Sequence, residues 1–258
     1  MRIAPWIIAA LLLGCTPAFA EDEEPSLSFF YPLLTRRPVI ERELEFKVVH
    51  TKGAEGRETE LAAAVELPIL PRWQLELEVP LMIAAPRDDT TRAGAGDLEI
   101  ENKFLLFKSL EHRAQVAAGF ELRLPTGSER RGLGGEAAIE PFITGGIALG
   151  DFDVLGSAAY EVNLNAHLHA PREHEVTAGV ATGYRWHRWF TPLVELTTVT
   201  RTRGDDDDGV LGRTQVYVTP GFNTRPLPGT TLRFGVQLPV TRARAFDYAL
   251  HGALVWEF

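Results

Sequence analysis

Glutamate occurs at every second position in several segments of the chain, for example at Glu76 and Glu78 and again at Glu99 and Glu101. Because successive side chains of a β-strand point to opposite faces, such glutamates would share one face of a strand. A surface rich in carboxylates attracts cations and disfavours anions, most strongly at low salt. Ionised carboxylates are costly to remove from water, so this face must meet water, basic side chains or both.

The positions between these glutamates are apolar, which indicates the kind of element that carries them. From Trp73 to Leu81, large apolar side chains occupy every odd position, while Gln or Glu occupies positions 74, 76 and 78. Twelve segments of about ten residues repeat this alternation, and short connections alternate with longer ones such as 83–96. The pattern is typical of strands with lipid on one face and water on the other. We therefore predict an all-β fold, a transmembrane up-and-down antiparallel β-barrel of about 12 strands, with short periplasmic turns and longer extracellular loops.

The two ends of the chain carry signals of their own. Residues 1–20 combine Arg2, an apolar run and Ala18-Phe19-Ala20, which predicts a secretory signal peptide cleaved after Ala20. An alternative is cleavage before Cys15, since the preceding residues resemble a lipoprotein lipobox. Residues 21–40 form an N-terminal arm rich in proline, and residues 41–258 form the barrel.

The last segment, from Tyr248, has large apolar or small residues at every even position and ends on an aromatic carboxyl terminus. It resembles the C-terminal signal of Gram-negative outer-membrane barrels, in which Leu254, Trp256 and Phe258 would be read by the barrel-assembly machinery. The alternative is the final edge strand of a soluble β-sandwich. The aromatic residues expected at the short-turn end would form an interfacial belt. They are Trp73, Trp186, Trp189, Phe190, Trp256 and Phe258.

Short blocks with proline or glycine where strands meet turns span most of the chain. They are Leu67–Trp73, Glu78–Leu81, Gly94–Leu98, Leu122–Gly127, Leu133–Gly135, Pro220–Phe222 and Val236–Val240. In order and spacing they resemble the outer-membrane β-barrel family named for the meta-pathway of phenol degradation, which also contains the functional-amyloid secretion channel. The resemblance implies a twelve-stranded outer-membrane channel. This chain lacks the long helical N-terminal region of the amyloid-secretion members.

If the apolar face meets lipid, the polar face lines the barrel interior. The residues that this phasing places there are Glu45, Glu76, Glu78, Glu99, Glu101, Lys103, Glu121, Arg123, Glu140, Glu161, Arg185, Glu195 and Arg233. Such a wall would pass small cationic or neutral polar solutes. The alternative is that ladders of Glu with Lys or Arg fill a narrow, closed barrel. Arg36 and Arg37 could enter the lumen as a plug and pair with these carboxylates. The prolines of the arm favour instead a disordered tail in the periplasm.

Other functions fit the sequence less well. With 26 basic against 35 acidic residues and a net charge of −9, the chain does not suit nucleic acid. No serine lies in a nucleophile-elbow pattern, so we expect no enzyme and no cofactor. His167, His169 and His174, or the run 205–208, could hold a metal, but a solvated loop is the simpler interpretation. The expected partners are the lipid bilayer and lipopolysaccharide; a secretion or assembly barrel with a partner protein, or a barrel-type enzyme, remains an alternative.

Overall fold

The computed structural model describes residues 27–164, 173–204 and 209–258 of the 258-residue chain. It contains thirteen strand segments and one short 3-10 helix, η1 (Glu129–Arg131). The strands are β1 (Glu43–Lys52), β2 (Gly56–Leu70), β3 (Trp73–Pro86), β4 (Arg92–Ala95), β5 (Leu98–Ser109), β6 (Ala114–Leu124), β7 (Ala138–Leu149), β8 (Phe152–Asn163), β9 (His174–Tyr184), β10 (Phe190–Arg203), β11 (Thr214–Leu227), β12 (Thr230–Pro239) and β13 (Tyr248–Glu257). Within the described ranges, no helix is long and apolar enough to cross a bilayer.

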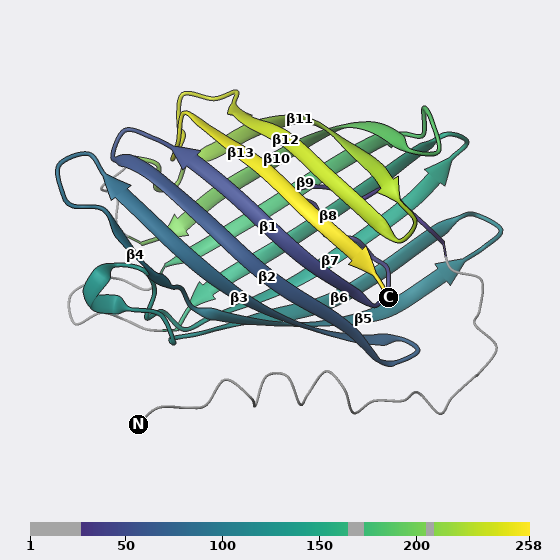
Figure 1. Ribbon diagram of the computed structural model, residues 1–258, viewed down its shortest axis with the longest axis horizontal. Helices are drawn as coiled ribbons and strands as arrows, with labels where there is room; N and C mark the ends of the chain where they lie inside the picture. Colours follow the sequence, from purple (N-terminus) through teal and green to yellow (C-terminus); the bar gives the residue numbers. More distant parts are fainter. Residues whose placement is uncertain (1–26, 165–172, 205–208) are drawn as a thin grey trace.

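The strands form one closed antiparallel barrel (Figure 1). Strands that follow one another in sequence pair, except that β4 and β5 both pair with β3, and β1 closes the ring by pairing with β13, where Leu44 lies opposite Trp256. Closure joins the two edges of the sheet, which is the condition for a sheet to cross lipid, and the short β4 pairs with β3 alone. The predicted all-β, antiparallel barrel is confirmed.

Thirteen segments make twelve barrel strands because β4 and β5 are two parts of one strand. Both pair with β3: Ala95 of β4 lies opposite Leu81, and Glu99 of β5 lies opposite Glu78. The register shifts by one residue between them, at Gly96, whose N–H still donates to the Pro80 carbonyl at 3.0 Å. The expectation of a single long loop over 83–96 is wrong, since pairing with β2 extends β3 as far as Pro86.

Alternation of apolar and polar residues decides which face points outward. In β13, Leu250, Leu254 and Trp256 are exposed on the outer surface, whereas Ala249 and Val255 are buried inside. The outer face of the other strands is likewise rich in exposed large apolar side chains. In water so large an apolar surface would favour aggregation, whereas hydrocarbon solvates it well.

The two ends of the barrel differ. At one end lie tight turns, including residues 150–151 and 228–229, in which Gly150 and Gly229 adopt positive φ angles of 63° and 66°. A residue without a Cβ adopts this left-handed conformation without steric cost. The carboxyl terminus lies at the same end, and the longer connections lie at the other (Figure 1).

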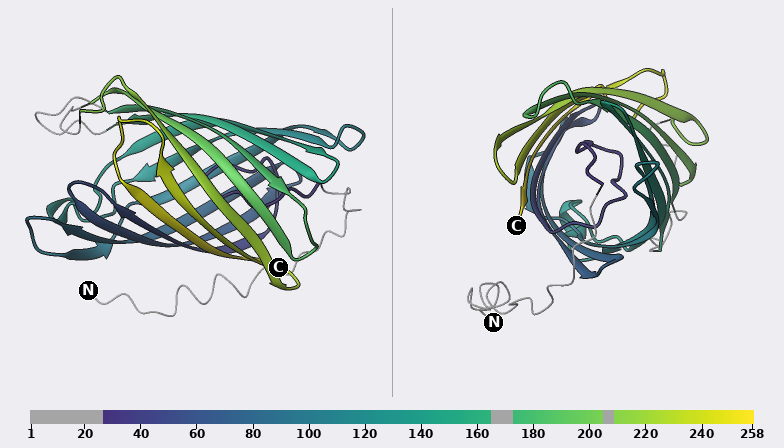
Figure 2. Two further views of the ribbon diagram at one scale, coloured as in Figure 1. Left: turned by 90° about the horizontal axis from the view of Figure 1, so that it is seen from above. Right: turned by 90° about the vertical axis from the view of Figure 1, so that its right-hand side faces the viewer.

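The interior of the barrel is occupied by the chain's own N-terminal arm. The view along the barrel shows the first described residues inside the ring of strands (Figure 2). Phe29, Phe30, Tyr31 and Val39 are each less than 5% exposed, at 1%, 4%, 2% and 3%. The described part of the arm, residues 27–40, therefore lies within the barrel, and the expectation of a disordered periplasmic tail is wrong for these residues.

Candidate functional site

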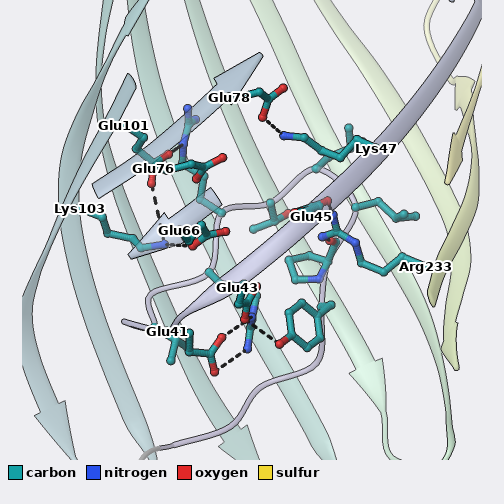
Figure 3. A pocket seen from close by; sticks show the side chains of 18 of the residues that line it. Glu41, Glu43, Glu45, Lys47, Glu66, Glu76, Glu78, Glu101, Lys103 and Arg233 are labelled. Atoms are coloured by element: carbon teal, nitrogen blue, oxygen red, sulfur yellow. Dashed lines mark hydrogen bonds and ion pairs between the residues drawn. The ribbon is translucent and has the colours of Figure 1, made fainter. Parts of the chain in front are cut away.

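One side of the barrel interior, the inward faces of β1 to β6, is acidic; we call it the acidic side. A cavity of about 260 Å³ separates it from the arm (Figure 3). Nine glutamates line this cavity against five basic side chains, of which two belong to the arm. The glutamates are Glu41, Glu43, Glu45, Glu66, Glu76, Glu78, Glu99, Glu101 and Glu121, and the basic residues are Arg36, Arg37, Lys47, Lys103 and Arg233.

Basic residues of the strands neutralise part of this wall. Lys47 pairs with Glu78, and Arg233 pairs with Glu45. Lys103 lies between two carboxylates, 3.6 Å from Glu66 and 3.8 Å from Glu101. Such pairs offset the cost of holding carboxylates away from bulk water.

A second ladder lies further along the wall. Arg123 bridges three strands, with nitrogen–oxygen distances of 3.1 Å both to Glu99 and to Glu161. The ladders expected from the sequence thus exist, but they coexist with a cavity whose lining retains more carboxylates than cations.

Arg36 contacts more carboxylates than the other charged residue of the arm, Arg37. Its guanidinium lies 3.0 Å from Glu101, 2.7 Å from Glu121 and 2.8 Å from Glu140, and its carbon is 4.5 Å from the centre of the Phe142 ring. Burial opposes the positive charge, but the three carboxylates outweigh this cost and hold the pKa of Arg36 above its ordinary value. Arg36 therefore joins β5, β6 and β7 through a single cation.

Arg37 and Tyr31 attach the arm where β1 meets β13. Arg37 pairs with Glu41 at 2.6 Å and Glu43 at 3.1 Å, and its guanidinium carbon lies 3.7 Å from the centre of the Tyr31 ring. The Tyr31 hydroxyl lies 2.7 Å from Glu43 and 2.6 Å from Glu257, so two carboxylates share its one proton.

The other side of the interior, the inward faces of β7 to β12, binds chiefly the backbone of the arm, apart from the ion pair of Glu140 with Arg36. Glu195 is fully buried and accepts hydrogen bonds from the backbone N–H groups of Leu33, Leu34 and Thr35, and from the Thr35 hydroxyl at 2.8 Å. These four hydrogen bonds offset part of the cost of burying the carboxyl group of Glu195.

A second buried carboxylate anchors the start of the arm. The Phe30 N–H donates to Asp153 at 3.1 Å, and Arg185 pairs with the same carboxylate. Arg185 also donates to the Ser28 carbonyl at 3.1 Å. Together with Glu195, this contact fixes both ends of the segment 30–35.

Inward-facing glycines on β7 to β12 receive the apolar side chains of the arm, and we call this the glycine side. A Cβ at Gly183 would lie 2.6 Å from the Phe30 ring, and one at Gly146 would lie 3.2 Å from the Phe29 ring. A Cβ at Gly235 would overlap the Leu33 side chain. Any larger residue at these positions would push the arm away from the wall.

The residues predicted to line the interior fall into four groups. Glu45, Glu76, Glu78, Glu99, Glu101, Lys103, Glu121 and Arg233 line the cavity. Glu140 and Glu195 contact the arm, and Glu161 pairs with Arg123. Arg185 lies beyond the end of β9, at the short-turn end.

Sequence reasoning missed Asp153 and the glycines of the wall, since it assigned glycine to turns. The available signal was their place at inward positions within strands. Of the proposed metal ligands, His167, His169 and residues 205–208 lie outside the described residues, while His174 lies 2.6 Å from the Tyr160 hydroxyl. No cluster of three or more His, Cys, Asp or Glu side chains suited to a metal occurs in the described part of the chain.

The sequence matches a protein family over residues 44–249, which cover nearly all of the barrel. Its description is "Putative MetA-pathway of phenol degradation". The chain belongs to this family. This match confirms the resemblance to the phenol meta-pathway family that the proline and glycine blocks indicated. Comparison with curated proteins gives no match.

Solved structures share the fold at low sequence identity. An outer membrane channel from Pseudomonas putida F1 superposes with a TM-score of 0.68 at 12% identity, covering 90% of this chain and 100% of that one. The NanC porin gives 0.59 at 12% identity, covering 83% and 98%. The beta domain of the Bordetella autotransporter Brka gives 0.54 at 9% identity, covering 84% and 99%. This family member therefore has the architecture of outer-membrane barrels.

Proposed function

We propose that this protein is an outer-membrane channel for small cationic or neutral polar solutes, and that its N-terminal arm is a plug that closes the pore. The observation that carries this proposal is a closed barrel whose acidic interior is filled by residues 27–40 of the same chain. The fold shared with a solved outer membrane channel and a porin supports a pore.

The charge of the cavity supports the selectivity. Arg36 and Arg37 supply two of the five basic side chains of the first cavity. When the arm leaves, nine glutamates would face only three basic residues, Lys47, Lys103 and Arg233. Release of the arm would thus open the pore and raise its negative potential together, which favours cations and excludes anions.

The surroundings of the barrel follow from the same proposal. The apolar outer face would contact the lipid bilayer, and the longer connections would face lipopolysaccharide at the cell surface of a Gram-negative bacterium. Leu254, Trp256 and Phe258 project from the outer face at the end of β13, where the barrel-assembly machinery would bind them. We assign no enzymatic activity, because the solved structures that share this fold include an outer membrane channel and a porin.

The test is single-channel conductance of the refolded mature protein in a planar bilayer, beside a chain that lacks residues 21–40. We expect the shortened chain to carry a larger, cation-selective current, read from the reversal potential in a salt gradient. Circular dichroism and thermal unfolding establish that both barrels are folded. Silence from two folded barrels would overturn the pore, and equal currents would overturn the plug.

A second candidate is a secretion barrel that works with a partner protein. One observation favours it: the interior holds an extended peptide, in which three of the four donors to Glu195 are consecutive backbone N–H groups that any sequence would supply. The shared fold with an autotransporter beta domain is compatible with this role. If an added peptide blocks the current of the chain without its arm, this candidate would be supported over a solute channel.

A further inference from the structure

A second cavity, of about 350 Å³, lies at the short-turn end of the barrel, beside the start of the arm. Its charged lining is of opposite sign to that of the first cavity. The basic groups are Arg113, Arg185, Arg188, Arg225 and His187, and they face one carboxylate, Asp153. Leu27, Phe29 and Phe30 supply an apolar floor.

The positive charge of this cavity is only partly neutralised. Arg185 pairs with Asp153, and Arg113 makes one weak hydrogen bond, 3.5 Å long, to the Gly150 carbonyl. Arg188 and Arg225 form no ion pair within the described ranges. Several guanidinium groups that share one concave space repel one another, and an anion placed between them relieves that repulsion.

We propose that this cavity is a binding site for an oxyanion, a phosphate or carboxylate group, held chiefly by Arg188 and Arg225. The planar guanidinium presents paired N–H donors that match the geometry of both groups. Arg188 comes from the turn between β9 and β10 and Arg225 from the end of β11. These two segments are neighbours, since the Arg225 N–H donates to the Trp189 carbonyl at 3.0 Å, so both guanidinium groups can reach one ligand.

The test is calorimetric titration of the refolded mature protein with inorganic phosphate, in neutral detergent and at low ionic strength. Replacing both arginines, Arg188→Gln with Arg225→Gln, should weaken phosphate binding about tenfold or more. The matched control is Arg213→Gln with Arg242→Gln, which removes the same charge at the opposite end of the barrel. Absence of binding, or equal weakening in both double variants, would overturn the site.

A measurement on the unaltered chain covers a failure of the variant to fold. Phenylglyoxal modifies accessible guanidinium groups, and peptide mass mapping reports each arginine separately. Phosphate should protect Arg188 and Arg225 at least about fivefold relative to Arg213, in line with occupied hydrogen-bond donors. Equal modification with and without phosphate would count against the site. Neither experiment requires the barrel to conduct, so the result is independent of the channel proposal.

The source of the anion is distinguished by the surrounding lipid. In nanodiscs of phosphatidylglycerol, a lipid headgroup that occupies the cavity would weaken phosphate binding relative to phosphatidylcholine. Unchanged affinity would identify a free anion as the ligand.

Discussion

The acidic side and the glycine side hold the same arm by different physical means. On the acidic side, Arg36 and Arg37 bind carboxylates through charge, over a cavity that leaves room for water. On the glycine side, Phe30 and Leu33 fit where the wall has no side chain. Charge contacts can exchange partners with water and salt, whereas packing requires one matching shape. We infer that the glycine side sets the position of the arm and that the acidic side determines how readily it leaves.

The two sides also use carboxylates differently. Glutamates of the acidic side face arginine side chains, whereas Glu195 on the glycine side faces the arm's backbone. A contact to backbone N–H groups holds the chain without depending on the identity of its side chains. The backbone and apolar groups of the arm thus fix its position on the glycine side. Carboxylates on the acidic side balance the charge of its arginines.

The largest effect should come from filling a hollow of the glycine side. Gly183→Leu would place a side chain where the Phe30 ring lies, so we expect the bound arm to lose about 3 kcal/mol or more. The open fraction in planar-bilayer recordings should approach that of the chain without its arm. Gly156→Leu, on the outward face of β8, is the control and should leave the current low. A closed pore in the Gly183 variant would show that the arm has a second binding position inside the barrel.

Removing the arm cation with the most carboxylate partners, Arg36, should have the next largest effect. Arg36→Met leaves Glu101, Glu121 and Glu140 without their shared partner. Because these carboxylates are partly hydrated, we expect the bound arm to lose only about 2 kcal/mol of stability. This loss corresponds to a rise of roughly thirty-fold in the open fraction. The measurement is open probability in the same recordings, together with its dependence on salt.

The matched control for this change is Arg123→Met, which breaks ion pairs within the wall that do not involve the arm. It should lower the thermal stability of the barrel without opening it. If Arg123→Met opens the pore as much as Arg36→Met does, the loss of wall charge and not the release of the arm would explain both currents.

The smallest effect is expected where the arm meets the junction of β1 and β13. Tyr31→Phe removes the hydroxyl that Glu43 and Glu257 share, so Glu257 would lose this donor while Glu43 keeps its ion pair with Arg37. We expect a loss of about 1 kcal/mol and a rise in open fraction of about fivefold. Thermal unfolding should change little, because the strand pairing of β1 with β13 is unaltered. A fully open pore would contradict the ranking of the two sides.

The pattern of polar and apolar residues was enough to predict the barrel, the number of its strands and which face of each strand points inward. A period of two in polarity follows directly from strand geometry, and closure follows from the need to pair every edge in lipid. The acidic interior was predictable for the same reason, since Glu76, Glu78, Glu99 and Glu101 share the parity of the polar face.

Only the tertiary structure decided what the interior contains. Leu34 and Glu195 are 161 residues apart, and periodicity specifies the face of a residue but not its neighbour across the barrel. The prolines of the arm favoured a free tail, since proline disfavours regular secondary structure. Local conformation could not reveal that distant strands form a cavity for this segment. The space beside Gly183 can receive the Phe30 ring only once the barrel has closed, because this space is formed between strands and not within a single strand.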